Sequence, residues 1–189
     1  MVELAAFASR NLDKARELEA LLPGWRIELL GEESYPPEVG ETYYQNARDK
    51  AAFGRTIEKR PIFVLGEDSG IEVEGLGWKP GVRSARFGGD DPVGRLLEAL
   101  EDIEGDGRRA RYVCELVCIS LEGEELRATG TLEGRIGWEP RGIEGFGYDP
   151  IFLPDSEERT VAELGNAWKR ENSHRARAAR ALLERLAAR

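Results

Sequence analysis

Hydrophobic residues recur along the chain with two spacings, one typical of strands and one typical of helices. Short apolar runs predict strands, and between them apolar residues return every three or four positions, as on one face of a helix. In the first such helix Ala15, Leu18 and Leu22 share a face, and Pro23-Gly24 ends the pattern. The predicted strands are Val2–Ala8, Trp25–Leu30, Ile62–Leu65, Arg111–Leu121 and Glu125–Leu132.

Polar residues with capping chemistry mark where further helices begin. Thr42 precedes one helix, and Asp91-Pro92 has the types expected of an N-cap and a first helical residue. Ser173 is in position to cap a final helix near the end of the chain. The apolar faces of the first and last of these helices are formed by Ala47, Ala51 and Gly54 and by Ala179, Leu182, Leu183 and Leu186.

Helices alternate with strands early in the chain, whereas a hairpin is predicted around Glu122-Gly123-Glu124. Extended structure is expected to break at 66–70 and to resume at Ile71 and Val73, and the glycine-rich Gly142–Asp149 predicts irregular backbone. A sheet that receives both crossovers and a hairpin is mixed. No repeat or linker divides the 189 residues, so we expect one α/β domain spanning residues 1–189.

Composition narrows the function classes that fit this domain. The net charge of −9 argues against a protein whose whole surface binds nucleic acid. No apolar run approaches the roughly 20 residues of a membrane span, and Met1-Val2-Glu3-Leu4 begins no signal peptide, so we expect a cytoplasmic protein without a membrane partner. Two cysteines, Cys114 and Cys118, and one histidine exclude disulfide frameworks and the usual zinc sites. We therefore expect any reaction of this protein to depend on carboxylates, a hard metal ion, or both.

Charge is unevenly distributed along this acidic chain. Residues 168–189 carry a net charge of +5, and the remainder sums to −14. The short basic segment at residues 168–189 can therefore bind a polyanion although the net charge of the chain is negative. For four of its arginines a solvated helix face is the favoured interpretation: Arg177, Arg180, Arg185 and Arg189.

The first candidate motif is Ser9-Arg10-Asn11-Leu12-Asp13-Lys14, between a strand and a helix. Free N–H groups at a helix N-terminus favour anions, and Lys14 would add a full positive charge. The alternative interpretation is an Asn11 N-cap followed by a surface lysine.

The second motif, Glu67-Asp68-Ser69-Gly70, follows an apolar strand directly. Carboxylates suit Mg²⁺, and one of them could also deprotonate a water molecule. The alternative is a tight acidic turn in which Gly70 has a positive φ.

Two more motifs lie in the second half of the chain. Gly145-Phe146-Gly147-Tyr148-Asp149-Pro150 offers close backbone approach and aromatic rings for stacking, although those rings could equally fill the core. Lys169 followed by Ser173-His174-Arg175 supplies cations for phosphate or a carbonyl, with a solvated basic face as the alternative.

These motifs belong to a longer ordered set that covers nearly the whole chain. The full set is Ser9–Lys14; Glu41-Thr42 with Asn46-Ala47 and Lys50-Ala51; Glu67-Asp68-Ser69-Gly70; Pro80-Gly81-Val82 with Ser84-Ala85-Arg86; Gly145–Pro150; Ala162-Glu163; and Lys169 with Ser173-His174-Arg175. In this order the motifs resemble the inosine triphosphatase family, the pyrophosphatases of non-standard purine nucleoside triphosphates.

The resemblance implies a single elongated mixed-sheet α/β domain with two lobes around an active cleft, assembled as a homodimer. It implies Mg²⁺-dependent hydrolysis of ITP, dITP and XTP to the monophosphate and pyrophosphate. Asp68 corresponds to the catalytic, metal-binding acid that accepts a proton from the attacking water. The residues that correspond to substrate-binding positions are Ser9, Arg10, Asn11, Lys14, Ser69, Phe146, Gly147, Tyr148, Asp149, Lys169, His174 and Arg175.

The chain departs from the family pattern at three positions. Gln45 stands where the resemblance implies a metal-binding glutamate, so Glu41 or Glu67 would have to contribute instead. Arg10 replaces a small residue, and Trp168 replaces a commonly acidic one. Two further hypotheses follow from these departures: an impaired protein that binds nucleotide without turnover, and a pyrophosphatase with shifted nucleotide specificity.

Overall fold

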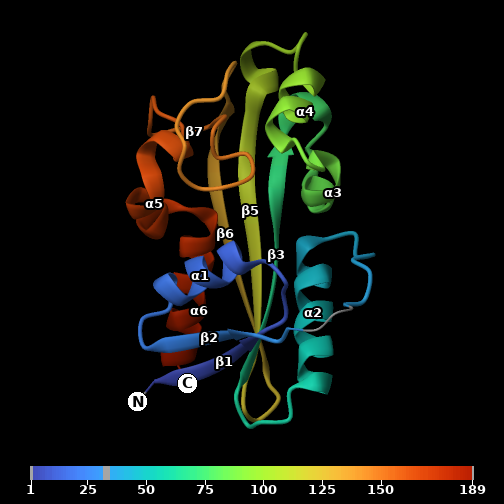
Figure 1. Ribbon diagram of the computed structural model, residues 1–189, viewed down its shortest axis with the longest axis vertical. Coiled ribbons are helices and arrows are strands. Elements are labelled where there is room, and N and C mark those ends of the chain that lie inside the picture. The colour runs from blue at the N-terminus through green and yellow to red at the C-terminus, as the bar shows by residue number, and fades with distance from the viewer. Residues whose placement is uncertain (1, 32–34, 189) are drawn as a thin grey trace. The chain divides into compact units, whose positions relative to one another are not determined.

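Seven strands form one mixed sheet in the computed structural model, which describes residues 2–31 and 35–188 (Figure 1). The strand order is β2-β1-β3-β5-β6-β7, and β4 pairs with β3. β1 runs parallel to β2 and β3, whereas β3–β4 and β6–β7 are antiparallel pairs, which confirms the predicted mixed α/β class. The strands are β1 (Glu3–Phe7), β2 (Trp25–Leu29), β3 (Phe63–Val73), β4 (Lys79–Pro80), β5 (Arg109–Ile119), β6 (Glu125–Ile136) and β7 (Phe152–Pro154).

Four α-helices of the described residues begin directly after the capping residues Asn11, Thr42, Asp91 and Ser173. Asn11 Oδ1 accepts a hydrogen bond from Lys14 N at 3.0 Å, and Asp91 Oδ1 accepts one from Gly94 N at 2.8 Å. The last helix starts at His174, directly after Ser173. The helices are α1 (Leu12–Leu21), α2 (Tyr43–Ile57), α3 (Ser84–Gly88), α4 (Pro92–Ala99), α5 (Val161–Asn172) and α6 (His174–Ala187). None of them is both long and apolar enough to cross a membrane.

Two sequence predictions about local structure are wrong. Residues 66–70 do not interrupt a strand, because β3 is one continuous strand of 11 residues and Gly70 has no positive φ. The helix α5 was not predicted, because Gly165 (φ 83°) breaks its helical geometry in the middle. Glu144 satisfies the freed backbone there by accepting a hydrogen bond from Asn166 N at 2.8 Å.

The chain divides into two compact units, each with its own hydrophobic core. Unit 1 contains residues 1–68, 114–130 and 175–189, and unit 2 contains residues 69–113 and 131–174. Strands β3, β5 and β6 each contribute one part to unit 1 and the other part to unit 2. Three strands therefore belong to both units, and the single domain expected from the sequence stays a prediction.

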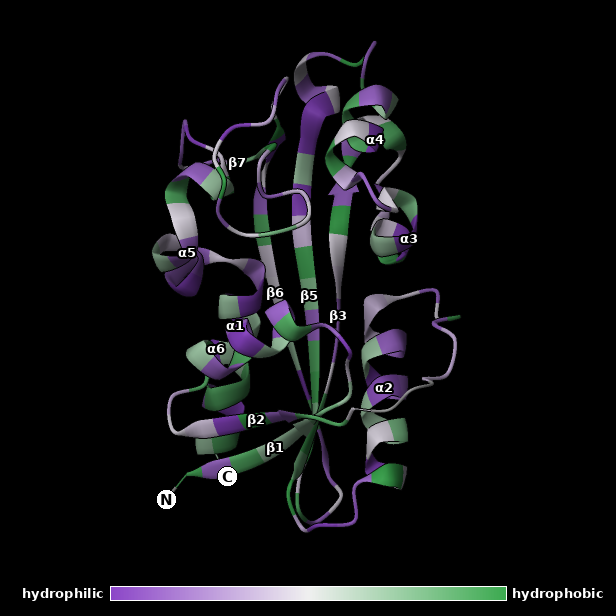
Figure 2. Cartoon of the chain, in the orientation of Figure 1, coloured by the Kyte–Doolittle hydropathy of each residue, from purple (hydrophilic) through white to green (hydrophobic). Residues whose placement is uncertain are grey.

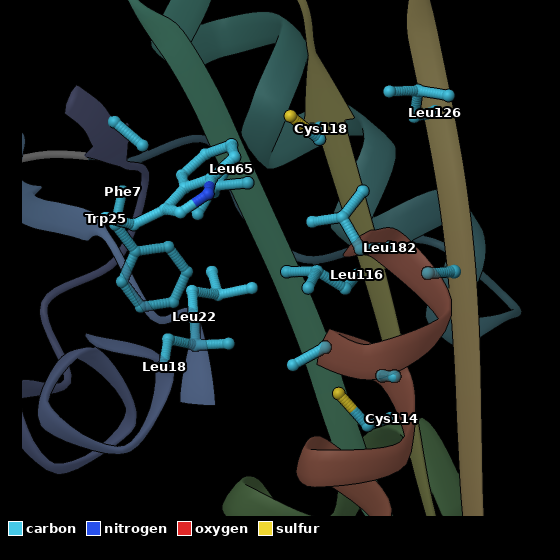
Figure 3. Packing of buried hydrophobic residues seen from close by; sticks show 14 of the residues in the cluster. Phe7, Leu18, Leu22, Trp25, Leu65, Cys114, Leu116, Cys118, Leu126 and Leu182 are labelled. Atoms are coloured by element: carbon cyan, nitrogen blue, oxygen red, sulfur yellow. The ribbon is translucent and has the colours of Figure 1, made fainter. Parts of the chain in front are cut away.

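In unit 1, helices cover both faces of the sheet. Leu18 of α1 and Leu182 of α6 pack with Leu65 in the main core, to which Cys114 also belongs (Figure 3). On the opposite face, α2 packs through Ala47 and Ala51 in a small cluster with Val117 and Ile119 (Figure 1). Figure 2 shows hydrophilic and hydrophobic bands alternating along α2, as expected of a helix with one buried face. Both cysteines are buried in the main core, and neither forms a disulfide bond.

Unit 2 is built around the other ends of the same three strands. Its core includes Ile71 and Val73 of β3, Tyr112 of β5 and Leu132 of β6, with Leu96 of α4 packed among them. The loop 142–149 is irregular, as predicted, with positive φ at Gly145 and Gly147. This loop and α5 carry most of the unit 2 residues predicted as site residues, whereas Ser69 lies in β3 and His174 is the first residue of α6.

Candidate active site

The loop Ser9–Lys14 connects β1 to α1 and ends in the N-cap described above. Ser9 Oγ accepts a hydrogen bond from Asn11 N at 3.1 Å, so two side chains of the motif stabilise its backbone. Arg10 is exposed, with its guanidinium 5.9 Å from the centroid of the Tyr35 ring. The alternative interpretation is therefore half correct: Asn11 is a cap, but Lys14 is not a surface lysine.

Lys14 belongs to a buried ionic group that we call the Glu67 cluster: Glu67, Lys14, Arg175, Glu17 and Cys114. Glu67 is 1% exposed, and its carboxylate lies 2.7 Å from Lys14 Nζ and 3.0 Å from Arg175 Nη2. Burial alone would raise the pKa of Glu67, but the charges of Lys14 and Arg175 outweigh it and hold that pKa well below its usual range. Arg175, itself 1% exposed, also pairs with Glu17.

Asp68 is surrounded by a different group, the Asp68 cluster: Asp68, Asn46, Lys50 and Glu38. Asn46 Nδ2 donates to Asp68 Oδ2 at 2.8 Å, and Lys50 Nζ lies 3.4 Å from Asp68 Oδ1. Lys50 Nζ also lies 2.5 Å from Glu38 Oε1, so one ammonium group joins two carboxylates. Burial raises the pKa of Asp68 above its ordinary value despite these partners.

The side chains of Glu67 and Asp68 point to opposite faces of the sheet. Consecutive residues of a strand point to opposite faces, and here Glu67 contacts side chains of α1 and α6 whereas Asp68 contacts α2. That Glu67 joins Asp68 in holding a metal ion therefore stays a hypothesis, and the partners of its carboxylate in the structure are two cations. Glu67 keeps Lys14 and Arg175 in place on its own face.

Helix α2 reaches Asp68 because β3 has a glycine two residues earlier. A Cβ atom at Gly66 would lie 2.1 Å from the carbonyl oxygen of Ala47 and 2.6 Å from the nitrogen of Ala51. Residues 66 and 68 share a face of the strand, and Asn46 and Lys50 are four apart on the helix. The bare backbone at Gly66 thus lets α2 lie close enough for both side chains to contact Asp68.

Gln45 has a structural role that the sequence analysis missed. Thr42 Oγ1 accepts a hydrogen bond from Gln45 N at 3.1 Å, and Gln45 Oε1 accepts from the backbone nitrogens of Glu41 and Thr42 at 2.8 and 3.1 Å. This is a capping box, which glutamine forms as well as glutamate does. The amide oxygen of Gln45 is therefore committed to the start of α2.

The described residues hold no group of three or more histidine, cysteine, aspartate or glutamate side chains placed for a metal ion. Two hard carboxylate ligands are nevertheless close, because Asp68 and Glu38 share Lys50. A cavity of about 370 Å³ is lined by Glu38, Asn46 and Lys50, among others. Oxygen ligands from one or two carboxylates, completed by water and phosphate oxygens, are the usual surroundings of Mg²⁺, so these residues fit that ion.

In unit 2, the predicted residues gather around a buried carboxylate in the Asp149 cluster: Asp149, Phe146, Lys169, Tyr112 and His174. Asp149 is 4% exposed and its Oδ2 accepts from Lys169 Nζ at 2.7 Å and from Phe146 N at 2.9 Å. Lys169 Nζ also lies 4.6 Å from the centroid of the Phe146 ring. Lys169 is therefore a buried, ion-paired residue rather than part of a solvated basic face.

The remaining predicted residues of unit 2 fall into two kinds. Tyr148 is a core residue, as the alternative interpretation held for this loop: it is 6% exposed, its hydroxyl donates to Ser84 O at 2.8 Å, and burial raises its pKa to about 12. Gly147 is exposed with φ 63°, and Ser69 follows Asp68 in β3 as the first residue of unit 2. His174 is 7% exposed and opens α6.

The predicted site residues thus form clusters within each unit, and some members were missed. Arg177, Arg180 and Arg185 are exposed, as expected, and Arg189 lies outside the described residues. Asn46 and Lys50 carried a usable signal, because they lie four apart beside the buried Ala47 and Ala51. No sequence signal marked Glu38, Glu17 or Tyr112, because only tertiary contacts bring these residues to the clusters.

Comparisons with known proteins show the family and the fold of the chain. The model of the Ham1 family matches residues 5–185. The chain is 43% identical over 187 residues to the dITP/XTP pyrophosphatase of Symbiobacterium thermophilum, covering 96% of this chain and 93% of the relative. It is 37% identical to the protein of that name from Bacillus subtilis, with 97% of each covered. Its fold matches the structure of the Staphylococcus aureus Ham1 protein with a TM-score of 0.84 and 30% identity, over 98% of this chain and 99% of that one.

Proposed function

Because the chain belongs to the Ham1 family, we propose that it hydrolyses the non-standard purine nucleoside triphosphates ITP, dITP and XTP to the monophosphate and pyrophosphate. The observation that carries this proposal is the Asp68 cluster, a buried carboxylate with a raised pKa oriented by an amide and an ammonium group. The names of the relatives, dITP/XTP pyrophosphatase, support the same substrate class.

Asp68 is the proton acceptor in this proposal. Water attacks phosphorus, the bond to the pyrophosphate leaving group breaks, and Asp68 takes the proton that the water loses. A carboxylate with a raised pKa is a stronger base than an ordinary aspartate, which suits this step. Asn46 and Lys50 hold one carboxylate oxygen each, and so fix the direction from which Asp68 accepts the proton.

Mg²⁺ is the proposed cofactor, held by Asp68 with Glu38 as the second carboxylate. When bound, such an ion offsets the charge of the phosphates and of the leaving group. In the nucleotide-free chain Lys50 offsets the charge of the same two carboxylates. Lys50 is therefore the residue whose contacts we expect to change when the cation binds.

Positive groups of unit 1 are proposed to bind the triphosphate. Lys14 is ion-paired with Glu67, but its charge also acts on Asp68, so it supplies an ammonium group near both carboxylates. The start of α1 supplies backbone N–H groups and the positive end of a helix dipole. Ser9, Arg10 and Asn11 stand in the same loop, and Ser69 follows Asp68. Glu67 holds Lys14 in place, since Lys14 Nζ lies 2.7 Å from the buried Glu67 carboxylate.

The Asp149 cluster is proposed to recognise the purine base. Phe146 offers a ring for stacking, Lys169 and Asp149 offer a charged donor and acceptor, and the His174 imidazole offers a donor to the 6-oxo group. Adenine presents an amine at that position, so donors built for a carbonyl would be left unpaired. Hydrogen-bond complementarity of this kind is what separates ITP from ATP.

A homodimer located in the cytoplasm completes the proposal, and light scattering of the purified chain tests the dimer. An impaired nucleotide-binding protein stays a hypothesis, because the capping role of Gln45 does not test turnover, and the measurement of pyrophosphate release decides it. Shifted specificity stays a hypothesis that the substrate panel tests.

The deciding experiment measures pyrophosphate release from ITP, dITP, XTP, ATP and GTP, with and without Mg²⁺. We expect rapid release from the first three only, dependent on Mg²⁺. Asp68→Asn should lower the rate by about 10³-fold or more while leaving the circular dichroism spectrum unchanged, since the general base is lost but the shape is kept. No release from ITP or XTP at enzyme concentrations near those of the substrate would refute the proposed function.

A further inference from the structure

We propose that Tyr112 is the positioning residue of the base-recognition group: its ring fixes the plane of the His174 imidazole, and its hydroxyl fixes the carboxylate of Asp149. This inference rests on the proposed function, because it assigns His174 and Asp149 to the base. Tyr112 itself lies in β5 and is 7% exposed, so its contacts are buried.

The two rings lie nearly parallel. The centroids of Tyr112 and His174 are 4.6 Å apart, with an angle of 8° between the ring planes. His174 is the first residue of α6, so its backbone position is set by the junction between two helices. Stacking on Tyr112 holds the imidazole in one plane, so its two nitrogen atoms point only in directions that lie within that plane.

Tyr112 can hold another ring in place because its own ring is held by the core of unit 2. The ring centroid of Phe152, in β7, lies 4.6 Å from that of Tyr112 at an interplanar angle of 43°. Both residues belong to the same buried cluster as Leu132 and Ile136 of β6. The orientation of the His174 imidazole is therefore tied to the sheet rather than to a mobile loop.

The hydroxyl of Tyr112 forms a hydrogen bond with Asp149, the second of the two residues that it positions. It donates to Asp149 Oδ1 at 3.2 Å, while Oδ2 accepts from Phe146 N and from Lys169 Nζ. Both oxygens of the carboxylate are thus engaged, which fixes its plane. Lys169 in turn lies over the Phe146 ring, so the position of Asp149 bears on the stacking ring as well.

Tyr112 contacts both His174 and Asp149. Hydrogen-bond discrimination between a 6-oxo group and an amine depends on donors and acceptors held in fixed directions. Loss of the Tyr112 ring should therefore weaken binding of the correct base and narrow the difference between ITP and ATP. The step at phosphorus should change much less, since Asp68 is not among its contacts.

The chain has a single histidine, so its imidazole proton signals in an NMR spectrum belong to His174 without further assignment. In the nucleotide-free protein we expect cross-peaks between these protons and those of a tyrosine ring. In Tyr112→Leu the imidazole signals should move downfield, because the shielding by a stacked ring is lost. In Tyr112→Phe they should stay near their wild-type positions, because the ring is kept.

Steady-state kinetics of the same variants test whether Tyr112 affects substrate binding. For Tyr112→Leu we expect the KM for ITP to rise about tenfold while kcat stays within about threefold, and for Tyr112→Phe a smaller rise in KM from the lost hydroxyl. Leu96→Ala is the matched control, since Leu96 is buried in the same core but is not part of the Asp149 cluster. It should lower stability and leave both the imidazole signals and the KM unchanged.

The inference is overturned if the wild-type cross-peaks are absent, or if Tyr112→Leu leaves the imidazole signals and the KM in place. It is also overturned if Leu96→Ala moves them as far as Tyr112→Leu does. Should Tyr112→Leu fail to fold, the wild-type cross-peaks and Tyr112→Phe still decide it. A wild-type protein that shows the stack but hydrolyses no ITP would refute the proposed function and leave the stack intact.

Discussion

Glu67 and Asp68 are neighbours in the chain, yet their surroundings move the pKa values of their carboxyl groups in opposite directions. Glu67 meets two cations on one face of β3, and these outweigh its burial. Asp68 meets an amide and a more distant ammonium group on the other face, and here burial wins. One carboxylate is thereby stabilised as an anion, and the other is left as the stronger base.

The first prediction concerns the stability that Glu67 provides. Glu67→Gln should lower the free energy of unfolding at pH 7 by about 3 kcal/mol, because Lys14 and Arg175 lose the anion between them. Glu72→Gln is a matched control in the same strand, where the ion pair with the half-exposed Arg111 should be worth about 1 kcal/mol or less. Urea unfolding measures both; equal losses would contradict the prediction.

The pH dependence of this stability has a definite sign. Because the folded-state pKa of Glu67 lies below its unfolded value, the stabilisation is fully present above the ordinary glutamate pKa of about 4.3 and is lost as the pH falls from there. The unfolding free energy of Glu67→Gln should therefore fall less steeply below that pH than that of the wild type. Parallel curves would show that the ion pairs of Glu67 contribute nothing to acid sensitivity.

At the scale of elements, the approach of α2 to β3 determines the Asp68 cluster. Asn46 and Lys50 contact Asp68 only because Gly66 lets the helix backbone lie against the strand. Gly66→Ala should push the helix away, lowering the unfolding free energy by about 2 kcal/mol and reducing turnover together, since the added methyl meets backbone atoms that cannot rotate aside. Urea unfolding and ITP turnover measure these effects. Wild-type turnover in Gly66→Ala would show that the distance of α2 is unimportant for activity.

The start of the same helix tests the role of Gln45. Gln45→Ala should cost about 1 kcal/mol through the lost capping box, whereas Gln45→Glu should keep the box and add about 0.5 kcal/mol by placing a negative charge at the helix start. Neither change should alter the Mg²⁺ concentration that gives half-maximal activity. A large fall in that concentration for Gln45→Glu would place this residue among the metal ligands after all.

For the whole molecule, two cores share three strands, and this predicts cooperative unfolding. Trp25 is the only one of the four tryptophans that lies in unit 1, so in a Trp25→Phe background the fluorescence reports unit 2. Adding Leu18→Ala, a truncation in the unit 1 core, should lower the free energy of unfolding by about 3 kcal/mol. The urea concentration at the midpoint of the fluorescence change should fall accordingly. An unchanged midpoint would mean that the two units unfold separately despite their shared strands.

Much of this architecture follows from local sequence patterns, and the exceptions have physical causes. The caps Asn11, Thr42 and Asp91 and the hairpin at 122–124 are local features, so sequence alone predicts them. Residues 66–70 resemble a loop because glycine and acidic residues disfavour strands, but pairing within the sheet overrides that preference.

The candidate site was predictable in its residue types but not in its contacts. The order of the motifs predicted Asp68, Lys14, Lys169 and Arg175 as site residues. It did not predict the ion pair between Glu67 and Arg175, which are 108 positions apart in the sequence. Periodicity cannot reveal such a contact, because it depends on how strands and helices are arranged in the folded chain. The same holds for Tyr112, which in sequence is simply an apolar position of a strand.

The alternation of faces along β3 has a consequence for how this gene can change. Deleting or inserting one codon between Phe63 and Glu67 would shift the strand by one residue and exchange the faces to which the two acids point. The carboxylate now beside Lys14 and Arg175 would meet α2, and the one now beside Asn46 would meet α1 and α6. Point substitutions can alter this strand one residue at a time, whereas a single-codon length change would invert its chemistry at once. The length of β3 should therefore be under stricter selection than most of its individual side chains.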